Sequence, residues 1–289
     1  MKKATKIILA VLILGVAFVW ASVARSPSAN ESKNGVSVYF LDVGQGDSEL
    51  IQKGDYQILI DGGPDDKVLS ELGKAMPLYD RKIEVVILTH PHADHLIGIN
   101  QILDRYQVDK IYYSGTLYTS NAYTEFLAKI NPPAGGQNIA SVIPNIGDKI
   151  TPFQNGELTF LWPGKQYEQK TNENANNTSE VARFCYFTHC VLFTGDAETD
   201  EQTKFINSAL VQSEILKIPH HGSTNGINQI LLDAVKPQTV IIEVGIDNKY
   251  GHPHTAVLDL LVQNSIKYYR TDRDGTIKLN IDEAGISKK

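Results

Sequence analysis

The sequence has no internal repeat, no long low-complexity tract and no excess of basic residues. Lys and Arg number 27 against 33 Asp and Glu, which gives a formal net charge of −6. This balance provides no overall basic footprint for nucleic acid, although it does not exclude a local basic groove. The length of 289 residues and the hydrophobic content of 42% are those of a globular protein with one large domain or two small ones.

Two familiar catalytic patterns are also missing. No Gly-x-Ser-x-Gly elbow surrounds Ser223, so a serine nucleophile is not indicated and Ser223 is expected to hydrogen-bond in its loop or to a substrate. The glycine-rich turn Gly44–Gly46 lacks the Walker pattern, so it is weak evidence for a phosphate-binding loop.

Cysteine is scarce, and Cys185 and Cys190 are the only two. They flank Phe187–Thr188, which is expected to be the two-residue turn of a hairpin and would place the cysteines opposite each other. Both a cross-strand disulfide and two free buried thiols fit this arrangement. His189 is expected to be a turn residue rather than a zinc ligand.

The N-terminal segment differs from the rest of the chain. Three lysines precede the apolar stretch 7–24, and this pattern is typical of a secretory signal. The stretch is also about the minimum length for a membrane span, so an uncleaved anchor is the alternative. We therefore expect export, with residues 1–24 as signal peptide or membrane anchor, 25–35 as linker and 36–289 as one domain. The product would be secreted, or anchored on the extracytoplasmic side.

The most informative stretch is His90–His95, which contains three histidines and an aspartate. It follows the apolar run Val85–Leu88, a predicted buried strand that Pro91 ends. Neutral imidazole and carboxylate suit zinc, and also manganese or iron. The spacing differs from the helical His-Glu-x-x-His of zinc proteases and predicts an irregular loop that can serve two metals.

The spacing His90-x-His92-x-Asp94-His95 resembles the signature of the metallo-β-lactamase fold hydrolases. Five further motifs make the chain similar to the lactamase-like domain of the ComEC/Rec2 competence proteins: Leu41–Asp47, Leu59–Gly63, Phe193–Asp196, Ile218–Ser223 and Tyr250–Pro253. The resemblance implies an α+β fold, the αββα sandwich of two mixed β-sheets with outer helices. Strands interspersed with helices in both halves of the sequence agree with this architecture.

The resemblance also implies two divalent metal ions, zinc or manganese, that share one carboxylate. The first ion would be held by His90 and His92, the second by Asp94, His95 and His221, and Asp196 would bridge the two. Many enzymes of the family place a further histidine before the Thr-Gly-Asp motif. This chain has Asn177 in that region, so the first ion would keep fewer protein ligands and more water.

Other residues are implied to surround the metals. Asp61 would accept the free N–H of a ligating histidine and fix its tautomer, although an Asp-Gly turn alone would also explain it. Asp47, Asn177 and Ser223 would line the site.

Three further histidines and the ligand Asp94 complete the implied site and its surroundings. His220 would face the substrate and donate to a phosphate, and Asp94 would act in catalysis as well as in metal binding. His252 would stabilise developing charge or protonate the leaving oxygen. His254 would cap a helix over 255–264.

The implied reaction is hydrolysis by a hydroxide that bridges the two metals. We expect a phosphodiesterase or nuclease that acts on DNA or another phosphodiester, with the membrane as a partner if the N-terminal segment is uncleaved. The alternatives are a phosphocholine-type phosphoesterase, a lactam or thioester hydrolase, and a non-catalytic DNA-handling module. The missing histidine near Asn177 and the motif His220–Ser223 argue against the lactam enzyme.

Local patterns predict four longer helices and a final hairpin. The helices are expected over 68–76, 96–106, 122–130 and 255–264. The residues Thr271–Leu279 are expected to form the closing hairpin of the domain.

Overall fold

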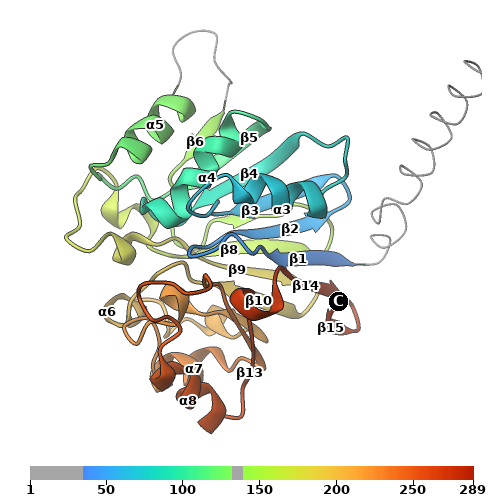
Figure 1. The fold of residues 1–289 in the computed structure, drawn as a ribbon, viewed down its shortest axis with the longest axis vertical. Helices are drawn as coiled ribbons and strands as arrows, with labels where there is room; N and C mark the ends of the chain where they lie inside the picture. Colours follow the sequence, from blue (N-terminus) through green and yellow to red (C-terminus); the bar gives the residue numbers. More distant parts are fainter. Residues whose placement is uncertain (1–34, 132–138) are drawn as a thin grey trace, which may run out of the picture.

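Figure 1 presents a computed structural model of the chain, which describes residues 35–131 and 139–289. The expected signal or anchor, 1–24, and almost all of the expected linker lie outside the described residues. Two β-sheets pack face to face, and helices cover their outer faces. The predicted αββα sandwich is therefore confirmed. No helix among the described residues is long and apolar enough to cross a membrane.

The first sheet has eight strands in the order β15-β14-β1-β2-β3-β4-β5-β6. Neighbours from β15 to β3 are antiparallel, whereas β3 to β6 run parallel. The strands are β1 Val36–Phe40, β2 Glu49–Lys53, β3 Tyr56–Ile60, β4 Lys82–Leu88, β5 Gln107–Tyr113, β6 Ala140–Val142, β14 Ile277–Asp282 and β15 Gly285–Lys288.

The second sheet has seven strands in the order β13-β12-β11-β10-β9-β8-β7. Its antiparallel part runs from β7 to β10, and its parallel part from β10 to β13. The strands are β7 Lys149–Ile150, β8 Gly156–Trp162, β9 Val181–Tyr186, β10 His189–Phe193, β11 Ile215–Lys217, β12 Thr239–Ile242 and β13 Lys267–Arg270. Both sheets thus have a parallel region whose strand ends can carry a site.

Among the described residues, the four predicted helices lie close to their expected positions, and three shorter helices that the sequence did not predict accompany them. They are α3 Lys67–Ala75, α4 Ala93–Leu103, α5 Asn121–Ile130, α6 Thr199–Gln202, α7 Gln229–Val235, α8 Thr255–Gln263 and α9 Thr271–Asp274. Two of them have a side-chain N-cap: Ser120 accepts from the Tyr123 amide at the start of α5, and Asn228 accepts from the Leu231 amide at the start of α7. Helix α4 starts at Ala93, three residues earlier than expected, so its first turn contains half of the central motif.

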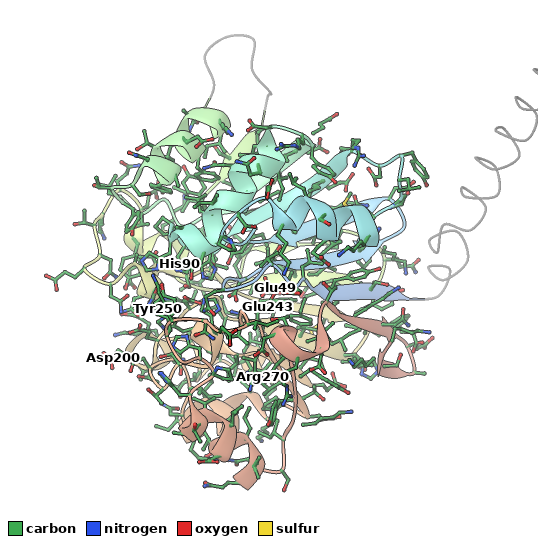
Figure 2. The ribbon with its side chains drawn as sticks, viewed as in Figure 1. Glu49, His90, Asp200, Glu243, Tyr250 and Arg270 are labelled. Carbon is green, nitrogen blue, oxygen red and sulfur yellow. A yellow bond between two sulfur atoms is a disulfide. The ribbon has the colours of Figure 1, made fainter. Side chains whose placement is uncertain are left out.

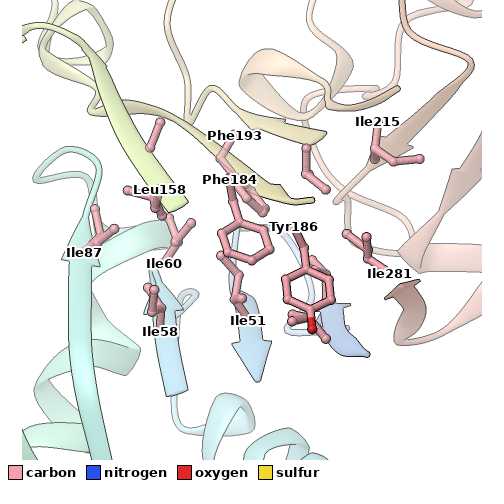
Figure 3. Packing of buried hydrophobic residues seen from close by; sticks show 14 of the residues in the cluster. Ile51, Ile58, Ile60, Ile87, Leu158, Phe184, Tyr186, Phe193, Ile215 and Ile281 are labelled. Atoms are coloured by element: carbon pink, nitrogen blue, oxygen red, sulfur yellow. The ribbon is translucent and has the colours of Figure 1, made fainter. Parts of the chain in front are cut away.

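The core follows from the alternation of side chains along each strand. In β1, Val38 and Phe40 enter the core between the sheets, whereas Tyr39 packs on the helix-covered side. Figure 3 shows Phe184 and its neighbours of the second sheet against isoleucines of the first. Because Phe184 is fully buried, its replacement by alanine would cost about 3–5 kcal/mol.

The predicted closing hairpin at 271–279 is wrong. Residues Thr271–Asp274 form the short helix α9, and the chain here crosses from β13 in the second sheet to β14 in the first. The Thr271 hydroxyl anchors this crossing, since it donates to the Val244 carbonyl and accepts from the Val244 amide. Turn residues such as Asp274 and Gly275 therefore mark a change of sheet, and the final hairpin joins β14 to β15 instead.

The hairpin of β9 and β10 has the expected turn at Phe187–Thr188. Cys185 pairs with Cys190 across the strands, and the two form a disulfide. His189 is not a turn residue, because it begins β10 and its Nδ1 lies 2.7 Å from Glu214 Oε1.

Candidate metal centre

The candidate ligands lie on loops at the carboxyl ends of parallel strands in both sheets. Asp61 follows β3, the stretch His90–His95 follows β4, Asp196 follows β10, and the pair His220–His221 follows β11. Since the carboxyl ends of parallel strands meet at one edge of a sheet, these loops converge although they are up to 160 residues apart in sequence.

The His-His loop has an unusual backbone that lets both histidines face one region. His220 and His221 have φ angles of 50° and 52°, in the left-handed region, so the alternation of a strand no longer applies. Gly222 follows with a φ of 83°, and a Cβ there would lie 2.6 Å from Pro253 Cβ. This close approach requires glycine and holds the loop against the segment that carries His252.

Asp196 lies at the middle of the centre. Its Oδ2 is surrounded by the Nε2 atoms of three buried histidines: 3.4 Å from His95, 3.7 Å from His221 and 3.9 Å from His90. The Nε2 of His221 also lies 3.4 Å from Asp94 Oδ2. Among the sets of ligand atoms that lie within 4.8 Å of one another, two consist of predicted ligands alone: His90–His95–Asp196 and Asp94–His95–His221.

His92 lies at the edge of this cluster. Its Nδ1 is 3.0 Å from Nε2 of His90, so the two rings present nitrogens to a common point. Its ring packs edge-on against Tyr118, with 5.6 Å between the centroids. Among the residues described, His92 joins no set of three mutually close ligand atoms, so the expected first position is more open than the second.

Several buried polar atoms of the centre have no hydrogen-bond partner. They are Nε2 of His95, Nε2 of His221 and Oδ1 of Asp196. An unsatisfied buried polar atom costs about 1–3 kcal/mol, so three of them in one place indicate a bound group. Imidazole nitrogens and a carboxylate form a donor set that fits zinc or manganese.

Asp61 and Asp47 support the two histidines of the second position. Oδ2 of Asp61 lies 2.6 Å from Nδ1 of His95, and the Thr89 amide donates to Oδ1 at 2.8 Å. Nδ1 of His221 hydrogen-bonds the Glu243 carbonyl at 3.0 Å, and Oδ1 of Asp47 lies 3.1 Å from the same nitrogen. Asp61 can accept the Nδ1 proton of His95, and the Glu243 carbonyl that of His221, so that each Nε2 is left free for a metal, as the sequence predicts for Asp61.

The electrostatics of the histidines differ sharply. Burial opposes a charge on His221, but Asp196 and Asp47 outweigh it and raise its pKa to about 10. In the same way the carboxylates around His95 overcome its burial and raise its pKa well above the usual range. Burial, together with the neighbouring His95, lowers the pKa of His90 well below that range.

Sequence reasoning missed a charged cluster beneath the second position. Lys217, fully buried on β11, contacts the Asp47 carboxylate and donates to the Gly195 carbonyl at 3.3 Å. Glu49 and Glu243 are buried beside them, and burial and Asp47 raise the pKa of Glu49 to about 8. A lysine within an otherwise apolar strand was the available signal for this cluster.

A pocket of about 290 Å³ opens onto the centre. It is lined by Gln45, His92, Ala93, Asp94, Asn176, Asp196, His220, His221, Tyr250 and His252. Figure 2 shows Tyr250, which is 51% exposed, in the same region as His90. The pocket thus brings together four of the six predicted ligands with both histidines assigned to the substrate side, whereas His90 and His95 lie outside its lining.

The three residues that the sequence predicts to line the site, Asp47, Asn177 and Ser223, do not line this pocket. Asn177 is replaced there by its neighbour Asn176, and the Asn177 carbonyl instead accepts from the Trp162 indole. Ser223 lies outside the pocket and its hydroxyl accepts from the Asn225 amide, the loop role that its sequence context allows. Asp47 acts from behind His221.

The remaining histidines have distinct surroundings. His252 is half-buried, and burial and the neighbouring His221 lower its pKa to about 4. His254 occupies the position before α8, but its side chain does not cap the helix as expected. Its Nδ1 accepts from the Thr224 amide and so ties the loop after β11 to α8.

Comparison with known proteins agrees with this geometry. Residues 41–242 match the profile of the metallo-beta-lactamase superfamily. ComE operon protein 3 of Bacillus subtilis is 29% identical over 83% of this chain, and Recombination protein 2 of Haemophilus influenzae is 26% identical over 83%. The chain spans only 32% and 28% of these relatives. The crystal structure of the metallo-beta-lactamase fold protein YhfI from Bacillus subtilis, 15% identical, superposes with a TM-score of 0.55 over 84% of this chain and 99% of that one.

Proposed function

Because the chain belongs to the metallo-β-lactamase superfamily of metal-dependent hydrolases, we propose that it is an exported phosphodiesterase that acts on DNA or another phosphodiester. The observation that carries the proposal is the Asp196 carboxylate among the unpartnered Nε2 atoms of His95 and His221. Two divalent ions held there by the ligands named above would activate a water and stabilise the charge of a phosphoryl group.

Two histidines beside the metal ligands are suited to contact the substrate. His220 and His252 line the pocket beside the ligands and face the place where a phosphoryl group would lie. Since its lowered pKa keeps His252 neutral at pH 7, His252 is suited to donate a hydrogen bond to developing charge rather than to release a proton. No side-chain nucleophile is required, and Ser223 does not line the pocket, since its hydroxyl accepts from the Asn225 amide.

The relatives support the choice of DNA. Recombination protein 2 is named for recombination, and Competence protein ComA of Neisseria gonorrhoeae, 24% identical over 91% of this chain, for competence. This chain spans only about a third of each relative, so their activities are not transferred whole. Export is supported by the lysines and the apolar stretch in residues 1–24. A signal peptide would release the domain, and an anchor would keep it at the outer face of the membrane.

Hydrolysis of bis(p-nitrophenyl) phosphate by the protein with added zinc or manganese tests this function. We expect metal-dependent turnover that is lost with a chelator and in Asp196→Ala, and that survives in Ser223→Ala. Turnover of p-nitrophenyl phosphate, a monoester, or of a β-lactam without any turnover of a phosphodiester would overturn the proposed substrate class. If the protein neither binds metal nor turns over any of these substrates, it is a binding module on this fold.

A further inference from the structure

Glu198 lies beside the centre and has a set of contacts that neither the ligands nor the fold explains. Two asparagines hold its carboxylate: Asn174 Nδ2 donates to Oε2 at 2.8 Å, and Asn176 Nδ2 donates to Oε1 at 3.0 Å. Both asparagines belong to one short turn, since the Asn176 amide donates to Asn174 Oδ1. The carboxylate is therefore fixed in place by the loop that precedes β9.

Capping does not account for this carboxylate. Glu198 precedes α6, but its side chain makes no hydrogen bond to the amides of that helix. It turns instead toward the pocket, where its Oε1 lies 3.3 Å from Nδ1 of His220. Among the described residues this buried Nδ1 has no hydrogen-bond partner, and Glu198 Oε1 is within hydrogen-bond distance of it.

The other nitrogen of His220 points to the centre. Its Nε2 lies 3.8 Å from Oδ2 of Asp196, too far for a hydrogen bond and on the side of the pocket. The backbone is held as well, because the His220 amide donates to the Gly195 carbonyl at 3.2 Å. The ring is thus set between two carboxylates, with Nδ1 toward one and Nε2 toward the site.

We propose that Glu198 is the positioning residue of His220. Held by Asn174 and Asn176, it accepts the Nδ1 proton and keeps Nε2 where it hydrogen-bonds a phosphoryl oxygen of the substrate. This part rests on the proposed function, because it assumes a phosphoryl substrate. It also gives the asparagine-rich loop a role: where the family resemblance leads one to expect a metal-binding histidine, this chain fixes a carboxylate that orients a substrate-side histidine.

Kinetics of four variants test the proposal. His220→Ala and Glu198→Ala should each lower kcat/KM for bis(p-nitrophenyl) phosphate by roughly 10- to 100-fold. The double variant should lose little more than either single one, because both remove the same oriented imidazole. Glu198→Gln, which keeps an oxygen acceptor, should recover part of the loss. Asp200→Ala, an exposed acid on α6, is the matched control and should leave kcat/KM unchanged.

Imidazole NMR of the ¹⁵N-histidine protein supplies a readout without turnover. A Nδ1–H signal that disappears in His220→Gln should be present in the wild type and in Asp200→Ala, and lost in Glu198→Ala. A signal that persists in Glu198→Ala would overturn the proposal, as would full activity of Glu198→Ala beside an impaired His220→Ala. If the wild type has no phosphodiesterase activity, the proposed function fails, and the NMR result alone decides whether Glu198 orients His220.

Discussion

The two candidate metal positions share a carboxylate but differ in what supports their histidines. At the second position the Asp61 carboxylate lies behind Nδ1 of His95, and Nδ1 of His221 has the Glu243 carbonyl at 3.0 Å and the Asp47 carboxylate at 3.1 Å. At the first position the Thr89 hydroxyl, at 3.1 Å, is the one partner of Nδ1 of His90 among the described residues. His90, His95 and His221 are all buried, so the difference between these three histidines is one of charge rather than of exposure.

The metal affinity of each position should depend on the group behind its histidines. A carboxylate behind an imidazole raises its basicity as a ligand, and a neutral hydroxyl does so less. We therefore expect the second position to bind its ion more tightly and the first to exchange its ion more readily. The Asn-rich loop points the same way, since it supplies no third histidine to the first position.

The largest expected effect comes from Asp196→Ala, which removes the ligand common to both positions. Turnover of bis(p-nitrophenyl) phosphate should fall by at least about 1,000-fold, and both ions should be lost from the purified protein. Metal analysis beside the kinetics measures this, with Asp200→Ala as the control. Retention of both ions in Asp196→Ala would show that the carboxylate is not shared.

Asp61→Asn and His90→Ala together test the inequality of the positions. Asp61→Asn removes the charge behind His95 and should weaken the tighter ion by roughly 10- to 100-fold. His90→Ala should remove the weaker ion and leave the tighter one bound. Competition with a coloured chelator gives both affinities. If either variant weakens the two ions equally, the two positions are not unequal in the way proposed.

The pH dependence of metal binding should distinguish the positions further. In the metal-free protein the raised pKa values of His95 and His221 keep both protonated at pH 7, and these protons must leave before Nε2 can bind. Because its pKa is lowered, His90 is already neutral at pH 7 and releases no proton when a metal binds. The tighter ion should thus release protons and bind better as pH rises, whereas His90 adds no such dependence. Calorimetry in two buffers of different ionisation enthalpy counts the protons.

The smallest effect on the centre should come from the disulfide, which lies on the β9–β10 hairpin. Reduction, or Cys185→Ser with Cys190→Ser, should lower the free energy of unfolding by about 2 kcal/mol. Metal affinity should not change, because neither cysteine lines the metal pocket. Thermal unfolding and chelator competition on the same samples measure both quantities. A change in metal affinity on reduction would contradict the prediction.

Much of the centre could be predicted because its most specific part is contiguous. The stretch His90–His95 and the Asp61 turn are visible as strand-end motifs, and the structure places them together. The role of Glu198 could not be found in this way, because it depends on contacts between loops of distant strands. Lys217 could be noticed as a lysine in an apolar strand, but its partner Asp47 follows only from tertiary packing. Similarly, Asp274–Gly275 has the chemistry of a hairpin turn, and only tertiary packing shows that the chain changes sheets there.

The central claim is that two unequal metal positions act as one hydrolytic centre. Adding zinc stepwise to the chelator-treated protein, while following hydrolysis of bis(p-nitrophenyl) phosphate, tests it most directly. We predict no turnover without metal, little after one equivalent, and a rise to full activity as the weaker second equivalent binds. Full activity with one equivalent, or turnover that persists in excess chelator, would contradict the account.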